Sequence, residues 1–141
     1  MERTVAVSGG FDPLHIGHVR MMEAARALGT RLVVIVNDDA FLMRKKGYVF
    51  MKEDERLEMV KSLRCVDEAL LAIDKDQTVR ETLRAIRPDV FANGGDRREK
   101  EDIPEAEVCA ELGIELVFNV GGGKVQSSSS LVRKGATKVY D

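Results

Sequence analysis

Residues 31–37, RLVVIVN, are the stretch that most constrains what this chain can fold into. Leu, Val and Ile fill its centre without a polar break, and most of them are β-branched. This composition is typical of a strand that is covered on both faces, as occurs in parallel sheets with a layer of helices on each side. The stretch therefore predicts an α/β protein.

Four more short β-rich runs alternate with segments of helical periodicity. We expect strands at 4–7, 68–73, 88–93 and 114–120, and helices at 18–28, 55–63, 78–86, 105–112 and from the serines at 127 onward. This order predicts a single Rossmann-like domain over residues 1–141, with a five-stranded parallel sheet and helices on both faces. Residues 44–55 fit neither pattern and predict an exposed loop.

Local signals set some of the expected helix ends. Gly29 and Gly113 follow helical segments and predict C-caps, and Thr78 with Glu81 forms a capping-box pattern. In a parallel sheet, ligands bind at the carboxyl ends of the strands. Unusual sequences follow four of the strands, so we expect them to meet in one crevice: 9–18, 37–39, 93–97 and 121–130.

The composition of the chain limits which binding partners and which cellular location we expect for the protein. A net charge of −2 over 141 residues argues against a general nucleic-acid binder. No apolar run is long enough to span a membrane, and residues 1–10 lack the features of a signal peptide, so we expect a cytoplasmic protein. Cys65 and Cys109 lie in apolar helical contexts and are expected to be buried thiols.

His15 and His18 are the only histidines, and both fall where the first strand passes into its helix. Three interpretations are open: histidines that cap the helix or pack in the core, a zinc site, or an anion site. Zinc is disfavoured because no third or fourth ligand lies nearby in the sequence. For an anion, the helix N-terminus offers free N–H groups, the imidazoles can donate hydrogen bonds, and Gly9 and Gly10 allow close approach.

The stretch GGFDPLHIGHVRMMEAARALG resembles the HIGH signature of the nucleotidylyltransferase superfamily. Small members of that superfamily include glycerol-3-phosphate cytidylyltransferase and the adenylyltransferase that activates heptose 1-phosphate. The resemblance continues in RLVVIVNDDAFLMRKKG, EDERLEMVKSLRCVDE, IRPDVFANGGD and QSSSSLV, which together cover nearly the whole chain. It implies the HUP-type nucleotidylyltransferase fold.

The resemblance also implies roles for particular residues. The catalytic residues would be His15, His18 and Lys46. The nucleotide would be bound by Gly9, Gly10, Phe11, Gly17, Gly95, Asp96, Ser127, Ser128 and Ser129. The second substrate would be bound by Asp12, Asp39, Arg56 and Arg97.

Without the resemblance, the chemistry of some of these residues also fits roles unrelated to ligand binding. Lys46 fits a solvated basic patch, Arg56 fits a surface pair with Glu53 or Glu55, and Arg97 fits plain surface charge. Asp12 is expected to orient the turn or to help place a metal ion.

The resemblance implies transfer of a nucleoside monophosphate from a nucleoside triphosphate to a small phosphorylated sugar or polyol, with release of pyrophosphate. Mg²⁺ would be bound mainly through the triphosphate, no protein residue is assigned to it, and the protein would be a homodimer. The cytidylyltransferases carry an arginine where this chain has Gly122, with Lys124 two residues later. Gly94-Gly95-Asp96 matches the heptose enzyme, so ATP is favoured.

Three alternatives remain open. They are a CTP-dependent enzyme for glycerol 3-phosphate or another alcohol phosphate, an archaeal-type FAD synthetase, and a non-catalytic nucleotide-sensing domain.

Overall fold

The computed structural model describes residues 1–94 and 103–121. Strands and helices alternate along this part of the chain. In order they are β1 (Thr4–Gly9), α1 (Ile16–Arg26), β2 (Arg31–Val36), α2 (Asp39–Lys46), α3 (Glu53–Lys61), β3 (Glu68–Leu71), α4 (Arg80–Ile86), β4 (Val90–Gly94), α5 (Ala106–Leu112) and β5 (Glu115–Val120).

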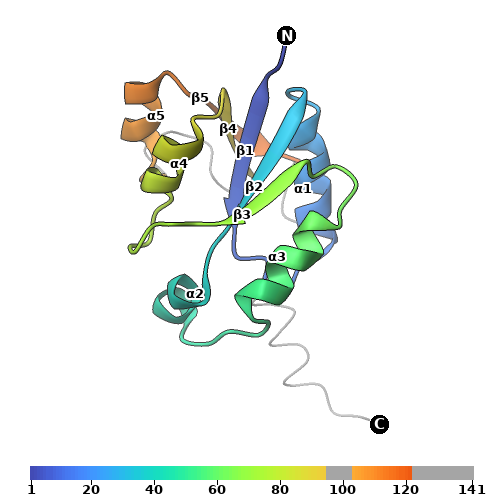
Figure 1. Ribbon diagram of the computed structural model, residues 1–141, viewed down its shortest axis with the longest axis vertical. Helices are drawn as coiled ribbons and strands as arrows, with labels where there is room; N and C mark the ends of the chain where they lie inside the picture. Colours follow the sequence, from blue (N-terminus) through green and yellow to red (C-terminus); the bar gives the residue numbers. More distant parts are fainter. Residues whose placement is uncertain (95–102, 122–141) are drawn as a thin grey trace.

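The five strands form one parallel sheet in the order β3-β2-β1-β4-β5. The expected fold class is confirmed. The chain builds outward from β1 through β2 to β3 and then returns to the other side of β1 with β4, so the order reverses between β1 and β4. Such a reversal leaves a crevice at the carboxyl ends of the two strands. In Figure 1 β1 points downward, toward the part of the molecule that contains α2 and α3.

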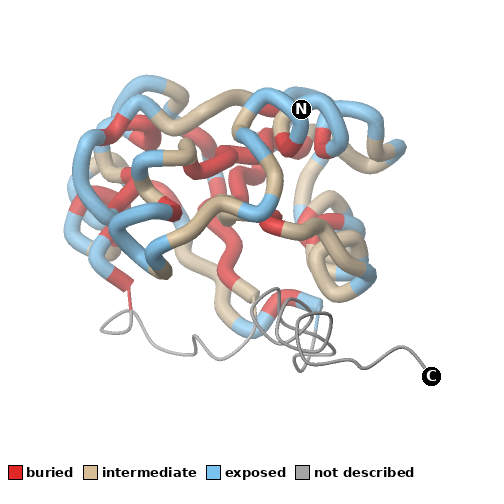
Figure 2. The backbone as a smooth tube through the Cα atoms, turned by 90° about the horizontal axis from the view of Figure 1, so that it is seen from below, coloured by how far each residue is buried: buried red, intermediate tan, exposed pale blue. Residues whose placement is uncertain are grey.

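Helices cover both faces of the sheet (Figure 1). On one face, α1 and α3 pack Met22, Ala25 and Val60 against the sheet. On the other face, α4 and α5 supply Leu83 and Cys109 to a second cluster. Figure 2 shows the resulting pattern, with a buried central layer and exposed turns around it. The run that predicted this architecture is fully covered, with residues 32–36 each at most 2% exposed.

The expected loop at 44–55 is wrong at both ends. The helix α2 runs to Lys46, and α3 begins at Glu53. Asp38 caps α2 by accepting a hydrogen bond from the Phe41 N–H at 2.8 Å, and Gly47 ends it with φ 80°. The apolar residues of α2, 40–43, are consecutive instead of recurring at helical spacing, so apolar periodicity did not reveal the helix.

Two expected caps are also wrong. Ala27 ends α1, and Gly29 is required for a different reason, since a Cβ there would lie 2.5 Å from the carbonyl oxygen of Arg3. At α4, the backbone N–H groups of residues 81 and 82 are bound by Asp74 rather than by a capping box. By contrast, Gly113 ends α5 with φ 72°, as expected.

Two further expectations concern the ends of the chain and the membrane. The last helix, expected from residue 127, lies outside the described residues. None of the helices in the described ranges combines the length and apolar character needed to cross a bilayer.

Candidate active site

The turn from β1 into α1 is held in an unusual backbone conformation. Phe11 has φ 53°, a left-handed value that costs free energy for a residue with a side chain, and its ring is buried. A Cβ on Gly9 would lie 2.9 Å from that ring, and a Cβ on Gly10 would lie 2.8 Å from Leu42. The two glycines are therefore needed for packing beneath the turn, in addition to the ligand approach that the sequence suggested.

His15 and His18 form a reciprocal cap on α1. The Nδ1 atom of His15 accepts a hydrogen bond from the Gly17 N–H at 3.1 Å. The Nδ1 atom of His18 accepts one from the backbone N–H of His15, also at 3.1 Å. The two rings stack with centroids 3.7 Å apart, and Phe11 meets His18 edge-on at 5.0 Å. The capping interpretation is correct, and it also fixes both rings in place.

This cap decides which nitrogen of each imidazole carries the proton. A neutral imidazole that accepts at Nδ1 bears its hydrogen on Nε2. Both rings are half-buried at the N-terminus of α1, so each brings an Nε2–H donor to the same end of the helix. Donors of this kind, fixed before a ligand arrives, suit phosphate oxygens.

The N-terminus of α1 also lacks the negative charge found at the other described helices. Its first turn contains no acidic residue. The first turns of α2, α3, α4 and α5 each contain at least one. The partial positive charge of the α1 terminus is therefore not offset by a neighbouring carboxylate in its own first turn, which favours an anionic ligand there.

Asp12 and Lys46 form an ion pair that is almost completely buried. The distance from Lys46 Nζ to Asp12 Oδ2 is 3.1 Å, and the two side chains are 15% and 1% exposed. Asp12 also accepts hydrogen bonds from the backbone N–H groups of Phe50 and Met51. Lys46 lies 4.6 Å from the centre of the Tyr48 ring. The contacts favour Asp12 as the residue that orients the turn, and they exclude the solvated patch for Lys46.

Arg56 is completely buried. Its guanidinium donates to the carbonyl oxygens of Gly10, Asn37 and Met51 and pairs with Asp39 at 2.7 Å. The surface pairing with Glu53 or Glu55 is therefore wrong. Contact of Arg56 and Asp39 with a substrate stays a prediction, since in this structure they contact each other. Their arrangement joins the carboxyl ends of β1 and β2 to α2 and α3.

The ends of β4 and β5 pack closely against α1. A Cβ on Gly94 would lie 2.8 Å from the Met21 side chain, and a Cβ on Gly121 would lie 2.9 Å from the Met21 Cα. Asn119 has φ 55° where the register of β4 and β5 shifts. The described parts of the four predicted strand-end segments thus lie at one edge of the sheet, around the N-terminal half of α1.

Several predicted site residues lie outside the described residues: Gly95, Asp96, Arg97, Gly122, Lys124, Ser127, Ser128 and Ser129. Their roles stay predictions. Gly17 is described, and its backbone N–H serves the cap of α1.

The described residues do not form a metal site. Within residues 1–94 and 103–121, no three His, Cys, Asp or Glu side chains come together in a way that would hold a metal ion. Both carboxylate oxygens of Asp12 already accept hydrogen bonds, so this residue does not fit a metal ligand.

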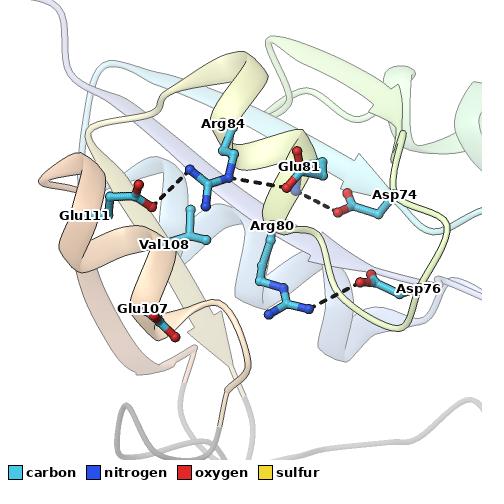
Figure 3. Close-up of a pocket in the computed structure, with 8 residues that line it drawn as sticks. All are labelled: Asp74, Asp76, Arg80, Glu81, Arg84, Glu107, Val108 and Glu111. Carbon is cyan, nitrogen blue, oxygen red and sulfur yellow. Dashed lines mark hydrogen bonds and ion pairs between the residues drawn. The ribbon is translucent and has the colours of Figure 1, made fainter.

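A hollow of about 210 Å³ lies between α4, α5 and the segment before α4 (Figure 3). Its two arginines are paired with acids: Arg80 with Asp76, and Arg84 with Glu81 and Glu111. Five carboxylates against two guanidinium groups make the lining acidic. This hollow therefore does not suit a triphosphate.

The sequence analysis placed Asn93 in the strand-end segment 93–97 but assigned no role to it. Asn93, at the end of β4, is 8% exposed, and its Nδ2 atom has no hydrogen-bond partner in the described structure. The only signal in the sequence was its place between a buried strand and the glycines at 94 and 95.

Comparisons with known proteins identify the family of the chain. A family profile described as cytidylyltransferase-like matches residues 6–134. The bifunctional protein HldE of Azorhizobium caulinodans is 38% identical over 137 residues, which are 96% of this chain and 28% of that protein. The FAD synthase of Methanosarcina mazei is 42% identical over 104 residues, which are 74% of this chain and 67% of that protein.

A solved structure gives the same result for the fold. The lipopolysaccharide core biosynthesis protein of Thermoplasma volcanium superposes with a TM-score of 0.71 at 27% identity, over 89% of this chain and 100% of that one. The chain spans between 24% and 28% of the length of the first HldE proteins that it matches. On the profile match and these relatives, the chain belongs to the cytidylyltransferase-like family.

Proposed function

We propose that this protein transfers a nucleoside monophosphate, with ATP as the favoured donor, to a small phosphorylated sugar or polyol such as a heptose 1-phosphate. A phosphate oxygen of the acceptor attacks the α-phosphorus of the nucleotide. The bond to the β-phosphate breaks, and pyrophosphate leaves. The reaction needs no covalent enzyme intermediate, so the protein contributes positioning and charge stabilisation.

The observation that carries the proposal is the reciprocal cap of His15 and His18. Because each Nδ1 accepts a backbone hydrogen bond, each Nε2 carries a hydrogen at the N-terminus of α1. That terminus lies at the end of β1, beside the crevice where the strand order reverses. The triphosphate is proposed to lie there, with Mg²⁺ bound to its phosphates as part of the substrate.

Lys46 is proposed to act from beneath the turn. It is held by the Asp12 carboxylate and by the Asp12 carbonyl oxygen at 3.0 Å. In this position it stabilises the turn that presents the histidines, and its charge lowers the free energy of phosphates bound at the same edge. Arg56 and Asp39 are proposed to support the second substrate's side of the site.

The choice of acceptor is guided by the relatives. HldE proteins match up to 96% of this chain, and the glycine pair at 94 and 95 fits the heptose-activating enzymes that the sequence resembles. FAD synthesis from FMN and ATP is the second candidate. It is supported by the FAD synthases of two Methanosarcina species, which are each 42% identical to the chain.

The test is release of pyrophosphate. The protein is incubated with each of the four nucleoside triphosphates, Mg²⁺, and one acceptor at a time: heptose 1-phosphate, other sugar phosphates, glycerol 3-phosphate or FMN. Turnover with ATP and a sugar phosphate is expected. Turnover only with CTP and glycerol 3-phosphate, or only with FMN, would replace the proposal with the corresponding alternative.

No release with any pair, together with measurable nucleotide binding, would support the nucleotide-sensing domain instead. A homodimer is proposed from the family resemblance alone, and the cytoplasmic location stays the expectation drawn from the sequence. Light scattering of the purified protein tests the homodimer, and cell fractionation tests the location.

A further inference from the structure

We infer that Asn93 binds the phosphorylated acceptor, by donating a hydrogen bond from its Nδ2 atom to an oxygen of that substrate. The inference rests on the proposed function and deepens it, because it assigns one side of the crevice to the second substrate. The observation behind it is the buried amide nitrogen that lacks a partner in the described structure.

A buried amide donor is normally hydrogen-bonded, because removing it from water without a partner costs free energy. Asn93 is 8% exposed, and its Nδ2 is the one buried side-chain nitrogen or oxygen left without a partner in the described ranges. Unsatisfied groups of this kind concentrate at binding sites, where a ligand supplies the missing atom. Nδ2 is a donor, so the matching ligand atom must be an acceptor.

The position of Asn93 places that acceptor in the crevice. Val5 pairs with Val90 and Ala6 with Phe91 across β1 and β4. Continuing this register by two residues brings Asn93 opposite Ser8, at the carboxyl ends of the two strands that flank the reversal of strand order.

Strand alternation shows which side of the sheet Asn93 occupies. Ala92 belongs to the cluster under α1 and α3, whereas Phe91 belongs to the cluster under α4 and α5. Gly94 again meets α1 at Met21. Asn93 therefore shares the face of Phe91, opposite the face covered by α1.

The reaction geometry assigns the two faces to different reactants. In an in-line displacement, the attacking oxygen and the leaving pyrophosphate lie on opposite sides of the α-phosphorus. The pyrophosphate end is proposed to lie at the N-terminus of α1. The attacking substrate then enters from the opposite side, where Asn93 is placed.

The ends of the neighbouring strands also place polar side chains on the face that is proposed for the acceptor. Ser8 and Asn37 follow Ala6 and Ile35 by two residues, and those two apolar residues belong to the cluster under α4 and α5. Alternation therefore places Ser8, Asn37 and Asn93 on one face of three adjacent strands. Hydroxyl and amide groups both donate and accept, which matches the hydroxyl groups of a sugar or polyol.

The test compares Asn93→Leu with wild type in two measurements. Because the Nδ2 atom of Asn93 has no hydrogen bond to lose, Asn93→Leu is expected to leave the melting temperature of the ligand-free protein unchanged or raised. Its KM for the acceptor is expected to rise by about 3- to 10-fold, while its KM for the nucleotide stays within about 2-fold. Asn93→Ala is the second variant, in case leucine does not fit.

Thr82→Val is the matched control, since it also removes a buried polar group. The Thr82 hydroxyl donates to Asp74 at 2.6 Å and accepts from the Ile73 N–H at 2.9 Å. Thr82→Val is therefore expected to lower the melting temperature and to leave both KM values unchanged.

The outcomes separate the two proposals. If wild type turns over no nucleotide and acceptor pair, the proposed function fails and the role of Asn93 fails with it. If wild type is active and the acceptor KM is unchanged in both Asn93 variants, only the inference is overturned. A rise confined to the nucleotide KM, or a fall in ligand-free melting temperature as large as that of Thr82→Val, also overturns it.

Discussion

At the scale of single residues, His15 and His18 use their two ring nitrogens for different purposes. The Nδ1 atoms cap α1, and the Nε2 atoms carry the ring hydrogens that are proposed to meet the phosphates. The structural and chemical roles that the sequence presented as alternatives are therefore compatible. They reside on different atoms of the same rings, which makes the two roles separable by mutation.

Asparagine at position 18 separates them, because its Oδ1 can accept the hydrogen bond now made to Nδ1 but it has no group in the place of Nε2. Both His18→Asn and His18→Ala are expected to lower turnover about 100- to 1,000-fold. Only His18→Ala is expected to lose helix-cap stability, by about 1 kcal/mol. Pyrophosphate release and urea unfolding measure the two effects. Wild-type turnover in His18→Asn would contradict the assignment of Nε2.

The sequence identified some residues of the candidate site but not the contacts that hold them. The histidines, the turn and Lys46 were visible because they fall in one short motif or in a stretch resembling the family. The ion pair between Lys46 and Asp12 was not visible, because the two residues are 34 positions apart and only the fold brings them together. Arg56 was expected near a ligand or at the surface, and nothing local to α3 shows that three backbone carbonyls converge on it.

At the scale of secondary-structure elements, Arg56 joins four parts of the site. It lies on α3, pairs with Asp39 at the start of α2, and binds carbonyl oxygens at the ends of β1 and β2. Its removal leaves those carbonyl groups without a donor. The loss is therefore expected to appear as instability and not only as weaker substrate binding.

Arg56→Met is expected to lower the free energy of unfolding by about 2–4 kcal/mol. Arg84→Met is the control, because Arg84 is 40% exposed and its pairs with Glu81 and Glu111 lie at the surface. Its loss is expected to cost less than about 1 kcal/mol. Urea unfolding measures both. If Arg56→Met is as stable as Arg84→Met and loses only turnover, Arg56 contacts substrate instead.

The helix α5 contains a group whose ionisation is coupled to folding. Burial, with a smaller contribution from the Glu105 carboxylate, raises the pKa of the Cys109 thiol from 9.0 to about 11. Between these values the folded protein holds a proton that the unfolded chain releases. The stabilisation is therefore fully present below pH 9 and is lost as the pH rises toward about 11.

Cys109→Ala removes this titration. The difference in unfolding free energy between wild type and Cys109→Ala is expected to shrink as the pH rises through that window, as measured by urea unfolding at several pH values. A difference that stays constant across the window would show that the thiol does not couple to folding.

The elements differed in how far the sequence revealed them. β2 was predicted because burial on both faces leaves an uninterrupted apolar run. The helix α2 was missed because it buries little more than Leu42, although Asp38 and Gly47 carried the signals for its two ends. The cap of α4 by Asp74 was not predicted either, because this carboxylate belongs to the loop after β3 and not to the start of the helix.

At the scale of the whole molecule, the order of the strands in the sheet determines which segments meet at the candidate site. The reversal between β1 and β4 brings the segments that carry the histidine pair and Asn93 to the same edge of the sheet, although they lie about eighty residues apart in the sequence. The alternation of strands and helices predicted a parallel sheet, but which strands are neighbours follows from how the crossovers pack. The strand order therefore had to come from the structure.

The most direct measurement of the central claim is a crystal structure with a non-hydrolysable nucleoside triphosphate and Mg²⁺. The account predicts the triphosphate at the N-terminus of α1, with phosphate oxygens within hydrogen-bond distance of Nε2 of both His15 and His18. A triphosphate bound in the hollow between α4 and α5, or at any site out of reach of both imidazoles, would contradict it.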